Sequence, residues 1–389
     1  MVIMITMIKP FSALKFFKEN KRKGLMTFVV LILSICAVSL ITVLINSIHE
    51  SYNDTVLKPF ANYSIVGNTS HDIYLNQSVV DRLKSDSNIE RLVPCDIDAT
   101  NVSFSIGGGL TYGVFADKSD IGYYLDKVND TVEQGRLPEN NSKEIAVHRR
   151  VMSNKNWEIG QTVGNEKNSD EMLSGAFKIV GILDGPSITF VGTQTNRQGQ
   201  YVKNELDTTK PINYAVFPKA GKMGAVNEML DKINVNDASV TTYSILKSQG
   251  EESFASIDNT LIAIILAVTI ILSISISALM YLIYLQRSDE FGILLAMGYR
   301  KSFIYRLIFK EVLALNIISW SVGLLASYLV IQLLNFLIYN PQGSMLNLFS
   351  ANVFENTIYI PVAAVLFSVL PILSKMRKQD PITIIEGRN

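Results

Sequence analysis

The side chains that most often do chemistry are few and scattered in this sequence of 389 residues. The three histidines, at positions 49, 71 and 148, show no HExxH pattern, and the two cysteines, Cys36 and Cys95, form no CxxC pair. The glycine run 107–109 lacks the lysine and hydroxyl of a phosphate-binding loop, so a hairpin turn is the better interpretation. No GxSxG elbow is present either. We therefore expect no catalytic residue, metal site or cofactor on this chain.

One short segment has a pattern suited to docking rather than to catalysis. Ser288 is a residue type that begins helices, acidic residues follow it in the first turn, and Gly298 stands where a helix commonly ends. We expect a short helix between them. The stretch 302–311 carries apolar residues at helical spacing, which suits a helix lying on a membrane surface. We expect Arg287 and Arg300 at the level of the lipid phosphates, so that the whole segment forms a compact knob beside a bilayer.

Four apolar runs long enough to cross a membrane position this segment. The first, residues 24–45, contains 22 residues without a charge and would span roughly 33 Å as a helix. It exceeds the apolar core of a signal peptide and no cleavage site follows it, so we interpret it as a membrane span. A charged fraction of 18% and a mean hydropathy of +0.24 agree with a membrane protein. The other expected spans are residues 261–285, 312–337 and 357–373, the last with Pro361 near its start and Pro371 near its end.

Basic residues indicate the side of the membrane that each connection occupies. Segments 1–23, 286–311 and 374–389 together hold 15 basic and 6 acidic residues, whereas residues 48–257 hold 20 basic and 27 acidic residues. The connection 338–356 contains no lysine or arginine. Because lysine and arginine accumulate on the cytoplasmic side, we expect both termini and the segment 286–311 on the inner side of a bacterial plasma membrane.

The region 46–260 is too long for a loop and is expected to fold as an extracytoplasmic α+β domain between the first two spans. Few helix breakers separate it from those spans, so both membrane helices are expected to extend outward as a two-helix stalk, with flexible linkers as the alternative. Strands are predicted at 63–66, 101–106, 112–115 and 177–183, and helices at 76–85 and 225–233. The fold class is therefore a membrane protein of four transmembrane α-helices with this domain inserted between helices 1 and 2. The other segments are a cytoplasmic amphipathic N-terminal segment (1–23), a cytoplasmic coupling segment (286–311), an outer loop (338–356) and a cytoplasmic tail (374–389).

The run Asp289–Gly298 resembles the E-x-G-I-L-x-A-[LM]-G signature of FtsX/MacB-type permeases, which follows the second membrane helix in that family. Residues 380–386 are similar to the closing D-P-[IV]-x-[AI]-[IL] motif of the family. In the outer region, pieces at 135–138, 144–147, 159–160 and 177–183 follow the order of the MacB-like periplasmic core. The resemblance covers essentially the whole chain. In that family the first segment is a coupling helix that docks into a cleft of the ATP-binding subunit, which implies docking roles here for Asp289, Glu290, Gly292, Ala296, Met297 and Gly298.

The resemblance implies the permease subunit of an ABC transporter, which transmits ATP-driven motion through the stalk to the outer domain. The implied cargo is peptides, lipoproteins or hydrophobic molecules. The implied partners are a separate ATP-binding cassette ATPase that holds ATP and Mg, a second permease chain, identical or different, and the lipid bilayer; we expect no nucleic acid. Because no G-x-x-x-x-G-K-[ST] motif occurs in the sequence, we expect ATP hydrolysis on the partner and not on this chain.

Three other functions are open alternatives. A regulator that activates cell-wall hydrolases is the closest, because it belongs to the same family. A membrane sensory receptor would share the two helices that flank an outer domain, but the sequence shows no output domain and two further helices would be idle. A membrane-bound enzyme is disfavoured by the missing catalytic residues.

Small residues suggest where two helices approach closely. Ser273 and Ser277 are four residues apart in the second span, so they share one helix face. Ser34 and Ser39 offer less regular small positions in the first span. We expect a dimer interface at the first two spans, and packing within one chain is the alternative.

Thiol labelling tests the expected topology. In a Cys95→Ser background, cysteines placed near Gly107, Asn141 or Gln198 should react with a membrane-impermeant reagent in intact cells, because the acidic region is expected outside. Tyr299→Cys should stay unlabelled until the cells are opened. Labelling of Tyr299→Cys in intact cells would contradict the topology.

Overall fold

A computed structural model describes residues 21–68, 75–103, 108–140, 142–193, 212–233 and 235–378. The chain divides into two compact units. We call the first the membrane unit: it consists of the chain up to Val43, Asp258–Leu333 and the chain from Asn347 onward. The second, the outer unit, consists of Leu44–Ile257 together with Leu334–Leu346.

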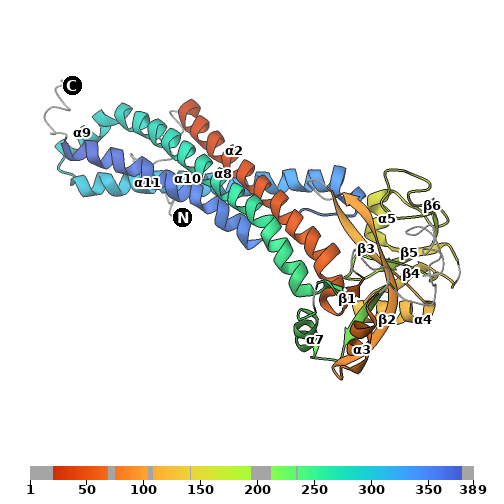
Figure 1. Cartoon of the computed structure of the whole chain (residues 1–389). Coiled ribbons are helices and arrows are strands. Elements are labelled where there is room, and N and C mark those ends of the chain that lie inside the picture. Colours follow the sequence, from red (N-terminus) through yellow and green to blue (C-terminus); the bar gives the residue numbers. More distant parts are fainter. Residues whose placement is uncertain are drawn as a thin grey trace, which may run out of the picture. The chain divides into compact units, whose positions relative to one another are not determined.

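Among the described residues, four long helices are apolar and long enough to cross a membrane. In Figure 1 they are α2 (Lys21–Tyr52), α8 (Tyr243–Gln286), α10 (Lys301–Leu334) and α11 (Ala351–Lys378), and the short α9 (Ser288–Ala296) lies between α8 and α10 in the chain. The predicted fold class is confirmed. Helix α11 extends beyond both ends of the span predicted at 357–373. Pro361 and Pro371, which the prediction placed near the ends of the span, both lie inside the helix.

Helix α10 packs against α2 along a row of small residues. Ser319, Gly323 and Ser327 are spaced four apart and are buried. A Cβ atom at Gly323 would lie 2.9 Å from the Cβ of Ile35, so glycine at this position lets the two helices approach closely. Such rows of small residues replace the hydrophobic effect as the basis of helix packing within lipid.

Helices α2 and α8 continue past the expected spans, and their continuations pack together within the outer unit. Helix α2 runs to Tyr52 and α8 already begins at Tyr243. The Tyr52 hydroxyl donates to the carbonyl of Leu246 over 2.7 Å, and its ring lies 5.2 Å from that of Phe254. A Cβ at Gly250 would lie 2.5 Å from the Tyr52 ring, so this glycine makes room for the ring against α8. These contacts form the pair of helices that the sequence suggested as a stalk.

The outer unit contains a mixed sheet of ten strands within the part that the structure describes. The order is β10-β1-β9-β2-β3-β8-β5-β7-β4, and β6 also pairs with β7. The long strand β2 (Ile89–Ser103) pairs with β9 up to Cys95 and with β3 from Asp96 onward, so it joins two halves of the sheet. The other strands are β1 (Ser64–Gly67), β3 (Gly108–Ala116), β4 (Thr131–Gly135), β5 (Glu144–His148), β6 (Thr162–Val163), β7 (Phe177–Asp184), β8 (Phe190–Thr193), β9 (Asn213–Pro218) and β10 (Ser239–Thr241).

Apolar side chains cover both faces of this sheet. Neighbouring residues of one strand belong to different clusters: Ile65 packs in the cluster around Tyr63 and Phe217, whereas Val66 packs under α3 and α7. Alternation of this kind places successive side chains on opposite faces. The covering helices are α3 (Gln77–Ser85), α4 (Lys118–Val128), α5 (Arg149–Lys155) and α7 (Met223–Leu230), and the shorter turns are η1 (Asn53–Leu57), η2 (Pro59–Ala61), η4 (Asn335–Tyr339) and η5 (Asn340–Gln342).

Most elements predicted for this region are present. Strands β2 and β3 pair antiparallel out to Ser103 and Gly108. The turn predicted at 107–109 is wrong for Gly108 and Gly109, which belong to β3, and residue 107 lies outside the described residues. Asn76 caps α3 by accepting a hydrogen bond from the Ser78 N–H over 3.0 Å. The strands predicted at 63–66, 112–115 and 177–183 overlap β1, β3 and β7. The helices predicted at 76–85 and 225–233 overlap α3 and α7. Of the strand predicted at 101–106, the first three residues belong to β2 and the rest lie outside the described residues.

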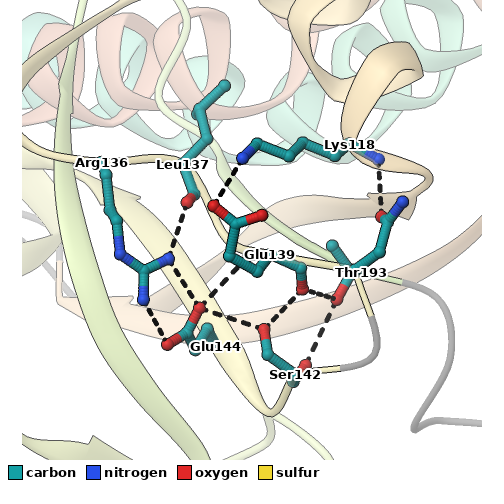
Figure 2. A network of polar contacts seen from close by, with 8 residues as sticks. Lys118, Arg136, Leu137, Glu139, Ser142, Glu144 and Thr193 are labelled. Atoms are coloured by element: carbon teal, nitrogen blue, oxygen red, sulfur yellow. Dashed lines mark hydrogen bonds and ion pairs between the residues drawn. The ribbon is translucent and has the colours of Figure 1, made fainter.

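A polar network pins the connection between β4 and β5 (Figure 2). Arg136 binds Glu144 with both terminal nitrogens, Nη2 to Oε1 over 2.6 Å and Nη1 to Oε2 over 2.8 Å. The Ser142 hydroxyl and the Glu139 N–H also donate to Glu144 Oε2. The Arg136 guanidinium lowers the pKa of Glu144 to about 2, because its hydrogen bonds favour the charged carboxylate.

Two glycines shape the same corner of the sheet. Gly135 has a φ of +76°, and a Cβ there would lie 2.2 Å from the carbonyl oxygen of Val180. A Cβ at Gly181 would lie 2.3 Å from the carbonyl oxygen of Arg136. The two backbone segments therefore come too close for side chains at either position. The sequence pieces at 135–138, 144–147 and 177–183 thus contain residues that build this corner.

Asp130, between α4 and β4, is a buried carboxyl group. Asp130 is only 3% exposed. Its Oδ1 accepts a hydrogen bond from the Ser187 N–H over 3.1 Å, and its Oδ2 has no partner in the described part of the chain. Burial raises the pKa of Asp130 to about 6, against the opposing effect of the Ser187 hydrogen bond.

Asp130→Asn should remove a pH dependence from the stability of the outer unit. A carboxyl whose pKa rises on folding stabilises the fold while it is protonated, and this contribution is lost as the pH rises from about 4 to about 6. With allowance for screening by water, it amounts to about 2 kcal/mol. The variant should therefore gain about this much relative to the wild type between pH 4 and pH 7. Fluorescence of Trp157 in a Trp320→Phe background reports unfolding of the outer unit.

Asp126→Asn is the matched control, because Asp126 is exposed on α4 and is not among the groups that raise the pKa of Asp130. It should leave the difference unchanged. Parallel pH profiles for Asp130→Asn and the wild type would contradict the buried-carboxyl interpretation.

Candidate coupling site

Helix α9 ends in a well-defined turn. Its last position is followed by Met297 as C-cap and by Gly298, whose φ of +89° favours glycine. The Gly298 N–H donates to Leu295 over 3.0 Å and the Tyr299 N–H donates to Leu294 over 3.1 Å. This pair of bonds is the Schellman motif, so the helix end predicted at Gly298 is confirmed.

The start of α9 differs by one residue from the prediction. The N-cap is Arg287, and Ser288 is the first helical residue, so the N-cap predicted at Ser288 is wrong. The Arg287 N–H still donates to the carbonyl of Tyr284 in α8, and the Arg287 carbonyl accepts from the Phe291 N–H. The last turn of α8 therefore runs directly into α9, which leaves no extended residue at Ser288.

Arg287 ties three helices of the membrane unit together. Its Nη1 lies 2.6 Å from Oε2 of Glu311 in α10, and its Nε lies 3.2 Å from Oε2 of Glu290 in α9. The guanidinium also lies 5.0 Å from the ring centroid of Phe291, which stacks on Tyr284 of α8. Arg287 is only 4% exposed, so its guanidinium faces these side chains and not the surroundings of the protein, and its level at the lipid phosphates stays a prediction. The carboxylate of Glu311 is the closest partner that holds Arg287 inside the chain.

The docking residues implied by the resemblance divide between the two faces of α9. Gly292 is buried with Phe291 and Leu294, so it packs within the chain and does not present a surface to a partner. Ile293 and Met297 are 55% and 57% exposed, and they give this face an apolar character. Glu290, Ala296 and Gly298 are exposed as well, and the side chain of Asp289 lies outside the described residues.

The structure places Ser273 and Ser277 within the chain. Ser273 is fully buried and donates to the carbonyl of Thr269 over 2.6 Å. The Ser277 hydroxyl donates to the carbonyl of Phe367 in α11 over 2.6 Å. This face of α8 thus makes contacts within the chain, as the alternative holds, and the dimer interface expected at the first two spans stays a prediction.

Glu311 is the residue of this site that the sequence did not single out. It is the acidic residue directly before the apolar run 312–337, a position where a carboxylate next to a membrane span suggests a buried cationic partner. Its partner Arg287 precedes it by 24 residues, outside the reach of any local helical spacing.

Part of the chain is similar to solved structures of extracytoplasmic regions. The periplasmic region of MacB from Actinobacillus actinomycetemcomitans is 13% identical, with a TM-score of 0.31, and the match covers 52% of this chain and 98% of that one. The extracellular domain of the noncanonic ABC-type transporter YknZ from Gram-positive bacteria is 11% identical, with a TM-score of 0.28, and the match covers 46% and 99%. Among curated proteins, none matches the chain.

In the part of the chain that the structure describes, four helices are long and apolar enough to cross a membrane and an α/β domain is inserted after the first, which suits a multi-pass membrane protein. Residues 262–381 match the family model of the FtsX-like permease C-terminal region. This match includes α9, α10 and α11 up to its last described residue. Over residues 262–381 the chain is therefore similar to FtsX-like permeases.

Removing one member of the Arg287–Glu311 pair should destabilise the membrane unit. Arg287→Ala leaves the Glu311 carboxylate buried without its cation, which typically costs about 3–5 kcal/mol. A lower unfolding temperature of the detergent-solubilised chain is the expected result. Arg300→Ala, at an exposed position, serves as the control.

The double variant Arg287→Met, Glu311→Met separates this effect from lost packing. It removes both charges and should recover most of the stability. A double variant as unstable as Arg287→Ala would show that the unpaired charge is not the cause.

Proposed function

We propose that the chain is the membrane subunit that couples ATP hydrolysis on a separate ATP-binding cassette ATPase to movement of the outer unit. Export or extraction of peptides, lipoproteins or hydrophobic molecules is the proposed task. The family to which residues 262–381 belong supports the permease role. The observation that carries the proposal is α9, a short helix with a fixed end and an exposed apolar face.

A coupling element has to be stiff in order to pass on a push. Helix α9 meets this requirement at both ends, through the Schellman turn at Gly298 and the ion pairs of Arg287. Because Arg287 contacts α10 directly and follows α8 without a break, a displacement of α9 would move both helices. Helix α8 continues into the outer unit beside α2, which supports transmission over the length of the chain.

The proposed assembly places α9 and both termini in the cytoplasm of a bacterial cell, as the distribution of basic residues indicates. The ATPase subunit holds ATP and Mg and docks on the exposed face of α9. A second permease chain completes the transporter. ATP hydrolysis belongs to the ATPase, since the sequence contains no phosphate-binding loop.

Met297→Glu should release the ATPase subunit. Met297 is exposed and apolar at the end of α9, so a charge there would have to be buried in the apolar cleft of a partner. A loss of about 2 kcal/mol, or roughly thirty-fold in affinity, is expected. Co-purification of the ATPase with the tagged chain and the ATPase rate that the complex shows are the measurements.

The matched control is Val235→Glu, which puts the same charge on an apolar residue of the outer unit that is 81% exposed. It should leave recovery of the ATPase unchanged. Gly292→Trp would also disturb docking, but only by displacing α9, because Gly292 is buried in this chain. Full recovery of the ATPase with Met297→Glu, or hydrolysis of ATP by the chain alone, would overturn the proposed arrangement.

A further inference from the structure

The connection between α10 and α11 belongs to the outer unit by its contacts. Residues Leu334–Leu346 group with that unit, although α10 up to Leu333 groups with the membrane unit. Asn335, which is buried, closes this connection on itself: its Nδ2 donates to the Leu346 carbonyl over 2.9 Å, and its Oδ1 accepts from the Leu346 N–H over 2.8 Å. The side chain thereby copies the pairing of a strand, and we call Leu334–Leu346 the outer hairpin.

Arg150 of α5 fastens the outer hairpin to two other segments. Its Nε donates to the carbonyl of Gly343 over 2.8 Å. Its Nη1 lies 2.7 Å from Oδ2 of Asp54, in the π-helical turn η1 that continues α2. One guanidinium therefore joins the sheet domain, the extension of the first membrane helix and the hairpin that follows the third.

Asn154, one turn further along α5, strengthens the same attachment. Its Nδ2 donates to the carbonyls of Ser103 and Gln342, over 2.8 and 3.1 Å, and its Oδ1 accepts from the Ser103 N–H. Gly343 lies flat against this helix: with φ at +68°, a Cβ on it would come within 2.9 Å of the Arg150 carbonyl oxygen. The hairpin thus meets α5 through backbone groups, which a loosely placed loop would leave to water.

His148 holds Arg150 in place at the start of α5. It is the N-cap of the helix, and its Nδ1 accepts a hydrogen bond from the Arg150 N–H over 3.1 Å. Burial lowers the pKa of His148, so the ring is neutral and able to accept at Nδ1. With Nδ1 as acceptor, Nε2 carries the proton and donates to the carbonyl of Gly185 over 3.2 Å.

We propose that the outer hairpin is a third mechanical attachment between the membrane helices and the outer domain, and that Arg150 is the positioning residue that fastens it. The inference rests on the proposed coupling function and adds a route to the two-helix stalk. Helix α10 receives the Arg287–Glu311 contact near one end and continues into the outer hairpin at the other. A displacement of α9 then reaches the sheet domain through α10 and Arg150 as well as through α8.

A cavity of about 370 Å³ beside Arg150 gives this fastening room to shift. Glu50, Asp54 and Arg150 are among the residues that line this cavity. Glu50 lies on α2, about one helical turn before Asp54 of η1. Asp54 is shared between Arg150 and Lys58. A slide of α2 by one turn would offer Arg150 the Glu50 carboxylate in place of Asp54, the kind of stepwise exchange by which packed helices switch between two arrangements.

Hydrogen exchange of the full chain in lipid nanodiscs tests the fastening. Arg150→Ala should speed exchange of the outer-hairpin amides by about ten-fold, because the hairpin loses its charged anchor. Arg149→Ala is the matched control: Arg149 is the neighbouring arginine on α5, and its ion pairs go to Glu133 and Asp184 rather than to the hairpin. Unchanged hairpin exchange in Arg150→Ala would overturn the proposal.

The second measurement adds the co-purifying ATPase, trapped with ATP, Mg and vanadate. In the wild type and in Arg149→Ala, trapping should change exchange both in α9 and in α5. In Arg150→Ala the change in α9 should persist and the change in α5 should fall to less than half, relative to the same chain without nucleotide. A further variant carries Arg150→Ala together with Asn154→Cys and Gln342→Cys, and its Cys36 and Cys95 are replaced by alanine. Bridging the two new cysteines with a short bifunctional thiol reagent should restore the change in α5.

The outcomes separate the two proposals. An equal response of α5 in Arg150→Ala and the wild type overturns the role of Arg150 and leaves the coupling function intact. Absence of any nucleotide response in wild-type α9 overturns the coupling function itself, and with it this inference. A bridged variant that fails to recover the response in α5 contradicts a mechanical role for the hairpin attachment.

Discussion

A guanidinium donates its five N–H groups in one plane and in fixed directions, so it joins only those segments whose acceptors lie in that plane, and this constraint organises both units of the chain. Arg287 satisfies it with two carboxylates and joins α8, α9 and α10. Arg150 satisfies it with a carboxylate and a backbone carbonyl and joins η1, α5 and the outer hairpin. Arg136 binds one carboxylate with both ends of its fork. In each case the fork holds its acceptors at a fixed distance and angle, whether the cation is buried, as Arg287 is, partly exposed like Arg150, or exposed like Arg136.

Features with a local physical cause were predictable from the sequence. Apolar runs fix the four membrane helices because every backbone group in lipid must be bonded within its own segment. The end of α9 followed from Gly298, since only glycine adopts that conformation readily. Strands and helices of the outer unit followed from the spacing of their apolar residues.

Features that depend on distant partners were not predictable. Gly292 looked available to a partner, but its burial depends on how α9 packs in the membrane unit. Ser277 was predicted at an interface from its spacing to Ser273. Its hydrogen bond to Phe367 was not foreseen, because the two residues are 90 positions apart in the chain. Arg150 gave no signal at all: Asp54 and Gly343, its acceptors, are 96 and 193 residues away. Hydropathy and spacing carry no information on pairs of this kind, and the surrounding polar residues of the outer region conceal them.

Strand β2 has a consequence for how the outer unit bears load. One half of this strand is hydrogen-bonded to β9 and the other half to β3, in sequence along a single backbone. A pull along the axis of β2 would therefore load the hydrogen bonds of each half in shear, all at the same time, and would not open them one after another. The backbone of β2, which rises about 3.3 Å per residue from Ile89 to Ser103, connects the two halves of the sheet covalently. Under tension the two halves therefore move together.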